Sequence, residues 1–198
     1  MAALLLFVVA CGDTTPADTA QERVVIGPDE DLAATIAGLA PGVIVVLQDA
    51  TYELRDTLVI TADREIRGSG GTVLRTAALA PSASTLASEV PEGFGQPVVY
   101  AEGITLVLRD VTVRSNEATG IGIANASTVL LESATLTDTA VGRNTWVGAH
   151  AVGAGSLTLR SATFTDNADH GVFVLADATL VIEGGRYAGA TRAPSSRA

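Results

Sequence analysis

The sequence predicts an all-β fold, a parallel β-helix, on three observations. The 198 residues are 47% hydrophobic but only 4% aromatic, so the apolar content is mainly the branched aliphatic residues that, with threonine, suit pleated strands. Short apolar–polar alternations separated by Gly, Asn, Asp or Ser recur along the chain, as they do in strands. The third observation is an internal repeat, the sign of a fold built from stacked units. This length suits one domain.

The charge balance disfavours one class of partner. Twelve basic residues stand against 22 acidic ones, which gives a net charge of -10. The field of such a chain repels phosphate backbones, so we expect no nucleic-acid partner.

The first residues are typical of an export signal. Ala2–Ala10 is an apolar run of nine residues, far shorter than the roughly 20 that span a bilayer. The run ends at Cys11, the only cysteine in the chain, and together they resemble the lipobox of bacterial lipoprotein signal peptides. The resemblance implies cleavage before Cys11 and acylation of that residue, which would anchor the protein to a membrane. No Lys or Arg precedes the run, which suggests a start further upstream; a buried strand with a free thiol is the alternative.

Four segments follow from this interpretation. Residues 1–10 form the signal peptide, residues 11–22 a flexible tether, residues 23–190 the β-helix domain and residues 191–198 a disordered tail. A single cysteine leaves no intramolecular disulfide, so packing alone must hold the fold. We therefore expect an exported, membrane-anchored lipoprotein of the bacterial cell envelope.

One helix is expected ahead of the strands. Asp29–Ala40 has the acidic start and the apolar spacing of an amphipathic helix. Strands are then expected at Val43–Leu47, Thr51–Leu54, Leu58–Ile60 and around the Ile66–Leu74 glycine turn. This order resembles the opening coil of the pectin-lyase-like right-handed parallel β-helix superfamily, in which a helix caps the first coil. The resemblance extends over residues 29 to 190.

The repeat has a period of 23 residues. Four segments align without gaps, and their starts lie 23, 28 and 23 residues apart, so one period carries a five-residue insertion: Leu106–Asn116, Val129–Thr139, Leu157–Asn167 and Leu180–Ala190. Between them lies a second set of short strands: Val98–Tyr100, Ile121–Ile123, Ala149–Ala151 and Val172–Val174. Three strands per period, stacked about 4.8 Å apart, describe a β-helix of about five coils with apolar ladders inside. A leucine-rich repeat, the competitor at this period, requires a helix or tight turn where this sequence alternates as a strand.

Alternation assigns a face to each residue of the second set. It directs Val98 and Tyr100 inward and leaves four residues outside, namely Val99, Gly122, His150 and Phe173. The five-residue insertion falls in Ala140–Val147, just before His150. We expect this loop to form a wall beside the outer face, and therefore a cleft.

The candidate ligand-binding residues surround this cleft: Arg143, Trp146, His150 and Phe173. Aromatic rings stack on sugar faces while polar groups bind hydroxyls, so the set points to a glycan. The resemblance also implies a ligand here, because this superfamily binds its ligands on the outer face of one strand stack. No metal motif is present; no cofactor is expected, although Ca²⁺ could bridge an anionic ligand to carboxylates.

Catalysis stays an open alternative. Asp138 stacked on Asp166 would give the acid pair of a glycosidase, and Asp169-His170-Gly171 faintly resembles a Gly-His-Gly element. The same acids also suit turns, and His150 and His170 could be plain surface residues. The catalytic sets of the superfamily's polygalacturonases and pectate lyases are missing. The primary interpretation is a non-catalytic binding or structural module, carbohydrate-related; the alternative is a polysaccharide lyase or glycoside hydrolase, active or degenerate.

The C-terminal end lacks a cap. No amphipathic helix follows Tyr187, and an open strand edge pairs readily with another chain. We expect either further coils beyond residue 198 or a partner subunit or domain at this edge.

Overall fold

The structure is a computed structural model. It describes residues 21–76, 97–115, 119–124, 127–133, 135–137, 147–151, 154–165, 170–174 and 177–187. These residues form strands and one helix, and every strand pair among them is parallel. The predicted all-β class with parallel pairing is confirmed.

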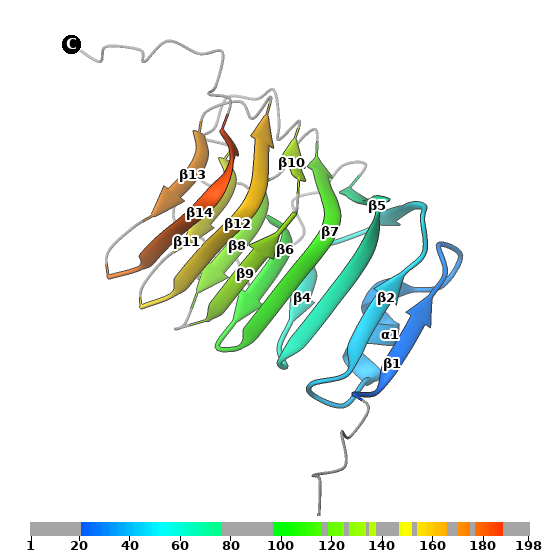
Figure 1. Ribbon diagram of the computed structural model, residues 1–198. Helices are drawn as coiled ribbons and strands as arrows, with labels where there is room; N and C mark the ends of the chain where they lie inside the picture. Colours follow the sequence, from blue (N-terminus) through cyan, green and yellow to red (C-terminus); the bar gives the residue numbers. More distant parts are fainter. Residues whose placement is uncertain are drawn as a thin grey trace, which may run out of the picture.

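The strands form two sheets, which Figure 1 shows running along the molecule. The larger sheet has the order β1-β2-β5-β7-β10-β12-β14, with β3 beside β5 and β9 between β7 and β12; the smaller has the order β4-β6-β8-β11-β13. The larger sheet comprises β1 (Arg23–Ile26), β2 (Ile44–Leu47), β3 (Thr51–Leu54), β5 (Arg64–Thr76), β7 (Thr105–Ser115), β9 (Thr128–Glu132), β10 (Thr135–Thr137), β12 (Ser156–Thr165) and β14 (Thr179–Tyr187). The smaller comprises β4 (Leu58–Ile60), β6 (Pro97–Glu102), β8 (Thr119–Ala124), β11 (Val147–Ala151) and β13 (His170–Val174).

The repeat alignment is confirmed residue by residue in the larger sheet. Leu106 pairs with Val129, Val129 with Leu157, and Leu157 with Leu180. Because side chains alternate between faces, the registered aliphatic residues form rows that are fully buried up to β12. Each such side chain contributes about 1.5–3 kcal/mol by leaving water, so these rows are the core.

Each repeat bends at one residue with left-handed backbone. Asp110, Ser133, Ser161 and Gly184 have φ values of 52°, 51°, 52° and 78°, and each directly follows the paired charged residues of its row. Gly185, at φ 123°, follows the last of them, and a Cβ there would collide with the carbonyl oxygen of Ala162. The sequence patterns did not reveal these bends, since Asp and Ser are also ordinary loop residues.

The predicted helix is present but shorter than expected. α1 (Leu32–Gly38) begins after Asp31, whose side chain accepts a hydrogen bond from the Ala34 amide at 3.0 Å. Its apolar residues Leu32 and Ile36 are buried in the core cluster. No helix within the described part of the chain is long and apolar enough to cross a membrane.

The faces assigned from sequence to Val99 and Tyr100 of β6 were wrong, whereas Val98 is buried in the main core as expected. Val99 pairs with Ile121 and Tyr100 with Gly122, so Val99 belongs to the core row and Tyr100 to the opposite face. Pro97 to Ala101 are all buried. A strand covered on both faces is apolar throughout, so its alternation carries no information about which face is which.

Candidate functional site

The predicted cleft residues fall partly on described strands. His150 lies in β11, and His170 and Phe173 lie in β13. The remaining candidates lie outside the residues that the structure describes: Cys11, Asp138, Arg143, Trp146, Asp166 and Asp169.

The register brings two of the candidates together. His150 is opposite Gly122 on one side and opposite Phe173 on the other, so His150 and Phe173 occupy adjacent strands in one row of the smaller sheet. His170 is opposite Val147, three positions earlier along the strands, which is about 10 Å away along the sheet. The two histidines are therefore not neighbours in a row.

The same row is buried over part of its length, although it ends at Val59 of β4, which pairs with Tyr100 and is 37% exposed. Tyr100 and Gly122 continue it through β6 and β8, and both are buried. Tyr100 packs with Ala124 in a small cluster separate from the main core. The outer face of the smaller sheet is thus covered along β6 and β8, and it is not the continuous open stack that the sequence suggested.

A ladder of alternating charges, which was not predicted from the sequence, crosses the larger sheet. We call it the charge ladder; its members are Glu65, Arg67, Arg109, Glu132, Arg160 and Glu183. The signal was present, because Arg109, Glu132, Arg160 and Glu183 occupy the same repeat position with alternating sign.

The charged side chains of the charge ladder form ion pairs with one another. Glu65 Oε1 accepts hydrogen bonds from Arg67 Nε at 2.6 Å and from Arg109 Nε at 2.7 Å. Arg109 also pairs with Glu132, and Arg160 Nε donates to Glu183 Oε2 at 2.7 Å. Burial alone would raise the pKa of Glu65, but the two arginine hydrogen bonds outweigh it and hold that pKa below its ordinary value. Charges paired in this way stabilise the sheet, and because they neutralise one another they produce little electrostatic attraction for a charged ligand.

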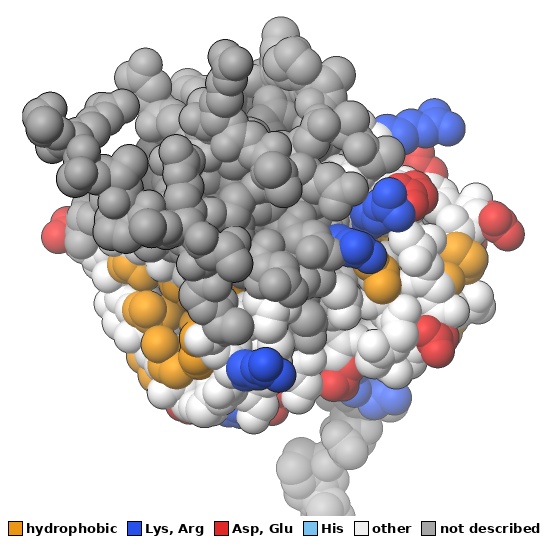
Figure 2. Space-filling view, turned by 90° about the horizontal axis from the view of Figure 1, so that it is seen from above, with side chains coloured by type: hydrophobic (Ala, Val, Ile, Leu, Met, Phe, Trp, Pro, Cys, Tyr) orange, Lys and Arg blue, Asp and Glu red, His pale blue; other side chains and the backbone are white. Residues whose placement is uncertain are grey.

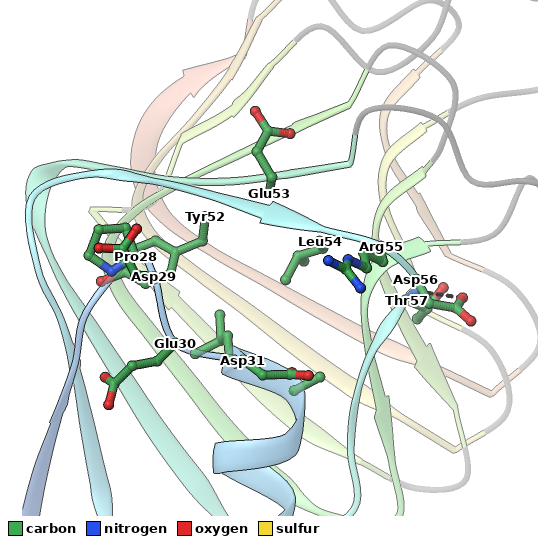
Figure 3. Close-up of a pocket in the computed structure, with 12 residues that line it drawn as sticks. Pro28, Asp29, Glu30, Asp31, Tyr52, Glu53, Leu54, Arg55, Asp56 and Thr57 are labelled. Atoms are coloured by element: carbon green, nitrogen blue, oxygen red, sulfur yellow. Dashed lines mark hydrogen bonds between the residues drawn. The ribbon is translucent and has the colours of Figure 1, made fainter.

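A second candidate is a cavity of about 390 Å³ between the start of α1 and the β3–β4 turn (Figure 3). Its lining carries one cation, Arg55, and five carboxylates: Asp29, Glu30, Asp31, Glu53 and Asp56. The excess of carboxylates would favour a cationic ligand over an anionic one.

Most of the polar groups in this cavity already serve the local backbone. Glu30 accepts from the Gly27 amide at 2.6 Å, Asp31 caps α1, and Asp56 accepts from the Thr57 amide at 2.7 Å. The Tyr52 hydroxyl donates to the Ile26 carbonyl at 2.6 Å and accepts from the Gln48 amide at 2.8 Å. Burial raises the pKa of Tyr52, so it stays protonated in that role. We therefore interpret these polar groups as stabilising the local backbone around the cavity, and we do not interpret the cavity as a reaction site.

Among the described residues, no group of His, Cys, Asp and Glu side chains could hold a metal ion. No family model matches the chain, and no curated protein or solved structure matches it either. The functional assignment therefore depends on the residues themselves.

Proposed function

We propose that the chain is a right-handed parallel β-helix resembling the pectin-lyase-like superfamily, and that it is a binding or structural module of the bacterial cell envelope. The main support is the register of the larger sheet, in which the four repeats pair in parallel at matching positions. Support also comes from α1, which lies at the start of the stack as a capping helix would. Both features agree with coils that wind in one direction from residue 23 onward.

The envelope address is proposed from the N-terminal sequence. Ala2–Ala10 followed by Cys11 has the form of a lipoprotein signal, and the polar segment after it would serve as a tether. An acyl chain on Cys11 would hold the domain at a membrane surface.

Metabolic labelling with palmitate tests this address. In a bacterial host the wild-type precursor should incorporate label, whereas Cys11→Ala should incorporate none. Equal labelling of both proteins would remove the basis for the lipid anchor.

A glycan is the proposed ligand. His150 and Phe173 stand in one row on adjacent strands, and the insertion Ala140–Val147, which carries Arg143 and Trp146, leads directly into β11. An imidazole and aromatic rings suit the hydroxyl groups and the apolar face of a sugar. A neutral glycan fits better than a polyuronate, because a net charge of -10 repels an anionic chain unless Ca²⁺ bridges the two.

Glycan-array binding of the wild type, Trp146→Ala and Phe173→Ala tests the ligand. Loss of one stacking ring should weaken binding by about 1–3 kcal/mol, with unchanged melting temperatures. Arg55→Ala, in the cavity beside α1, is the control and should bind normally. Equal binding by all four proteins would place the ligand elsewhere, and no binding by the wild type would leave only the structural role.

One observation keeps a glycosidase or lyase as the second candidate. Thr137 and Thr165 are paired between β10 and β12, and Asp138 and Asp166 follow them directly in the chain. Two carboxylates at equivalent repeat positions could divide the acid and base roles of a glycosidase. Cleavage of a bound glycan, by hydrolysis for a glycosidase or by elimination for a lyase, that is lost in Asp138→Asn and in Asp166→Asn would favour this candidate.

A further inference from the structure

The larger sheet ends in an exposed strand. β14 pairs with β12 on one side, and no described strand lies on its other side. Its core-row residues Leu180, Ile182 and Tyr187 are 36%, 52% and 40% exposed, whereas their partners in β12 are 0% exposed. Figure 2 shows hydrophobic side chains gathered at this end of the molecule. A strand with free backbone groups and half-exposed apolar side chains is a template for a further strand.

The charge ladder is also incomplete at this strand. In the interior, Glu132 lies between two arginines, Arg109 and Arg160. Glu183 is bound by Arg160 alone, so its outer side lacks the cation that the pattern calls for. Arg186, two residues beyond the bend, is exposed and forms no ion pair with any residue that the structure describes. β14 thus carries one half-satisfied anion and one unused cation.

We propose that β14 pairs antiparallel with β14 of a second copy of this chain, across a two-fold axis that passes between Gly184 and Gly185. In this register Glu183 faces Arg186 of the second copy, and Ile182 faces Tyr187 of the second copy. The two-fold axis repeats both pairs, so each copy completes the charge ladder of the other. Of the half-exposed apolar residues that end the core rows, Ile182 and Tyr187 therefore meet across the axis.

The bend of β14 selects this register. The left-handed residues Gly184 and Gly185 divide the strand into two arms, and two bent strands stay paired along both arms only where their bends coincide. A shift by one residue would set core-row side chains opposite outward ones. A shift by two would separate the bends and set Glu183 opposite an uncharged residue, either Gly184 or Ala188.

A second β14 also fits better than the edge strand at the opposite end of the sheet. β1 spans only the four residues Arg23–Ile26, so it could pair with one arm of β14 and not with both. Pairing of β14 with β1 would also be head-to-tail and would build open filaments, whereas two β14 strands close into a dimer.

A charge exchange between two variants tests the proposal. The full chain, carrying Cys11→Ser so that it stays unlipidated, is measured by light scattering coupled to size exclusion over a dilution series. Arg186→Glu sets two carboxylates opposite each other, and Glu183→Arg sets two guanidinium groups opposite each other, so each variant alone should dissociate. We expect the dissociation constant of each to rise at least about tenfold, which corresponds to about 1.4 kcal/mol. An equimolar mixture restores both opposite-charge pairs and should return to dimer.

Arg55→Glu is the matched control, an exposed charge reversal beside α1 that should leave the dimer intact. Melting curves check folding, which matters for Glu183→Arg because Glu183 also binds Arg160; recovery in the mixture cannot come from an unfolded variant. A monomeric wild type, filaments in place of dimers, a dimer that both variants leave unchanged, or a mixture that stays monomeric would each overturn the proposal.

Discussion

Single residues set the corners of this fold. Asp110, Ser133 and Ser161 hold a left-handed conformation that costs a non-glycine residue roughly 1–2 kcal/mol. The strand pairing on either side of each bend holds it in place, because the residues before and after it are hydrogen-bonded to neighbouring strands. The strand can therefore turn while its neighbours stay paired, at a small local cost.

This strain predicts opposite outcomes for two substitutions at an exposed corner. Ser161→Gly should leave the free energy of unfolding unchanged or raise it by up to about 1 kcal/mol, because glycine adopts positive φ freely. Ser161→Val should lower it by about 1–2 kcal/mol, because a β-branched residue is disfavoured there. Denaturant unfolding measures both, with Thr158→Val on the same strand as the control. A harmless Ser161→Val would show that the corner is not constrained.

At the scale of elements, the charge ladder ties neighbouring strands of the larger sheet together. Glu65 in β5 binds Arg109 in β7, and Arg109 binds Glu132 in β9. Because each ion pair joins two neighbouring parallel strands, it forms only when the two strands are in the correct register. Exposed ion pairs contribute little individually, but Glu65 is only 16% exposed and accepts two arginine hydrogen bonds.

The lowered pKa of Glu65 predicts a pH dependence. A carboxyl whose pKa is lower in the folded state adds stability that is fully present above its ordinary pKa of 4.5, and the stability is lost as the pH falls through the lowered value. Glu65→Gln should therefore cost about 1–2 kcal/mol at pH 7, and this difference from the wild type should shrink below pH 4.5. Denaturant unfolding at several pH values measures it. A difference that stays constant down to pH 3 would mean that the charge of Glu65 contributes nothing.

At the scale of the whole molecule, the two ends of the stack differ. One end is covered by α1, while β14 is exposed at the other (Figure 1). Arg64 stands in register with Leu106 and so ends a core row at the covered end. It is only 4% exposed and donates to the carbonyls of Ala40 and Leu39 at 2.7 and 3.1 Å. This arginine links the segment after α1 to β5.

Removing that link should loosen the covered end. Arg64→Met keeps much of the side-chain volume but removes the guanidinium hydrogen bonds to the carbonyls of Leu39 and Ala40, so it should cost about 1–3 kcal/mol. Thermal melting measures the loss, and Arg55→Met at an exposed site should change stability by less than about 0.5 kcal/mol. Hydrogen exchange should rise first in α1 and β2. A variant as stable as the wild type would show that α1 holds its place without Arg64.

Much of the architecture could be predicted from the sequence because the repeat and the alternation are local patterns. The pairing of Leu106, Val129, Leu157 and Leu180 follows from a fixed period, and α1 follows from apolar spacing and an acidic start. The candidate site was predictable only in part. The alignment placed His150 beside Phe173, yet it did not reveal that the same row is buried at Tyr100.

The sequence by itself determined the all-β class, the parallel pairing of the repeats and the composition of the core rows in the larger sheet, since each depends on periodicity alone. Only the tertiary structure decided the face of Val99, because a strand buried on both sides has no polar positions to orient it. It also decided which charges meet in the ladder and which residues take positive φ. These features depend on contacts between strands that are distant in the chain, so local sequence patterns do not reveal them.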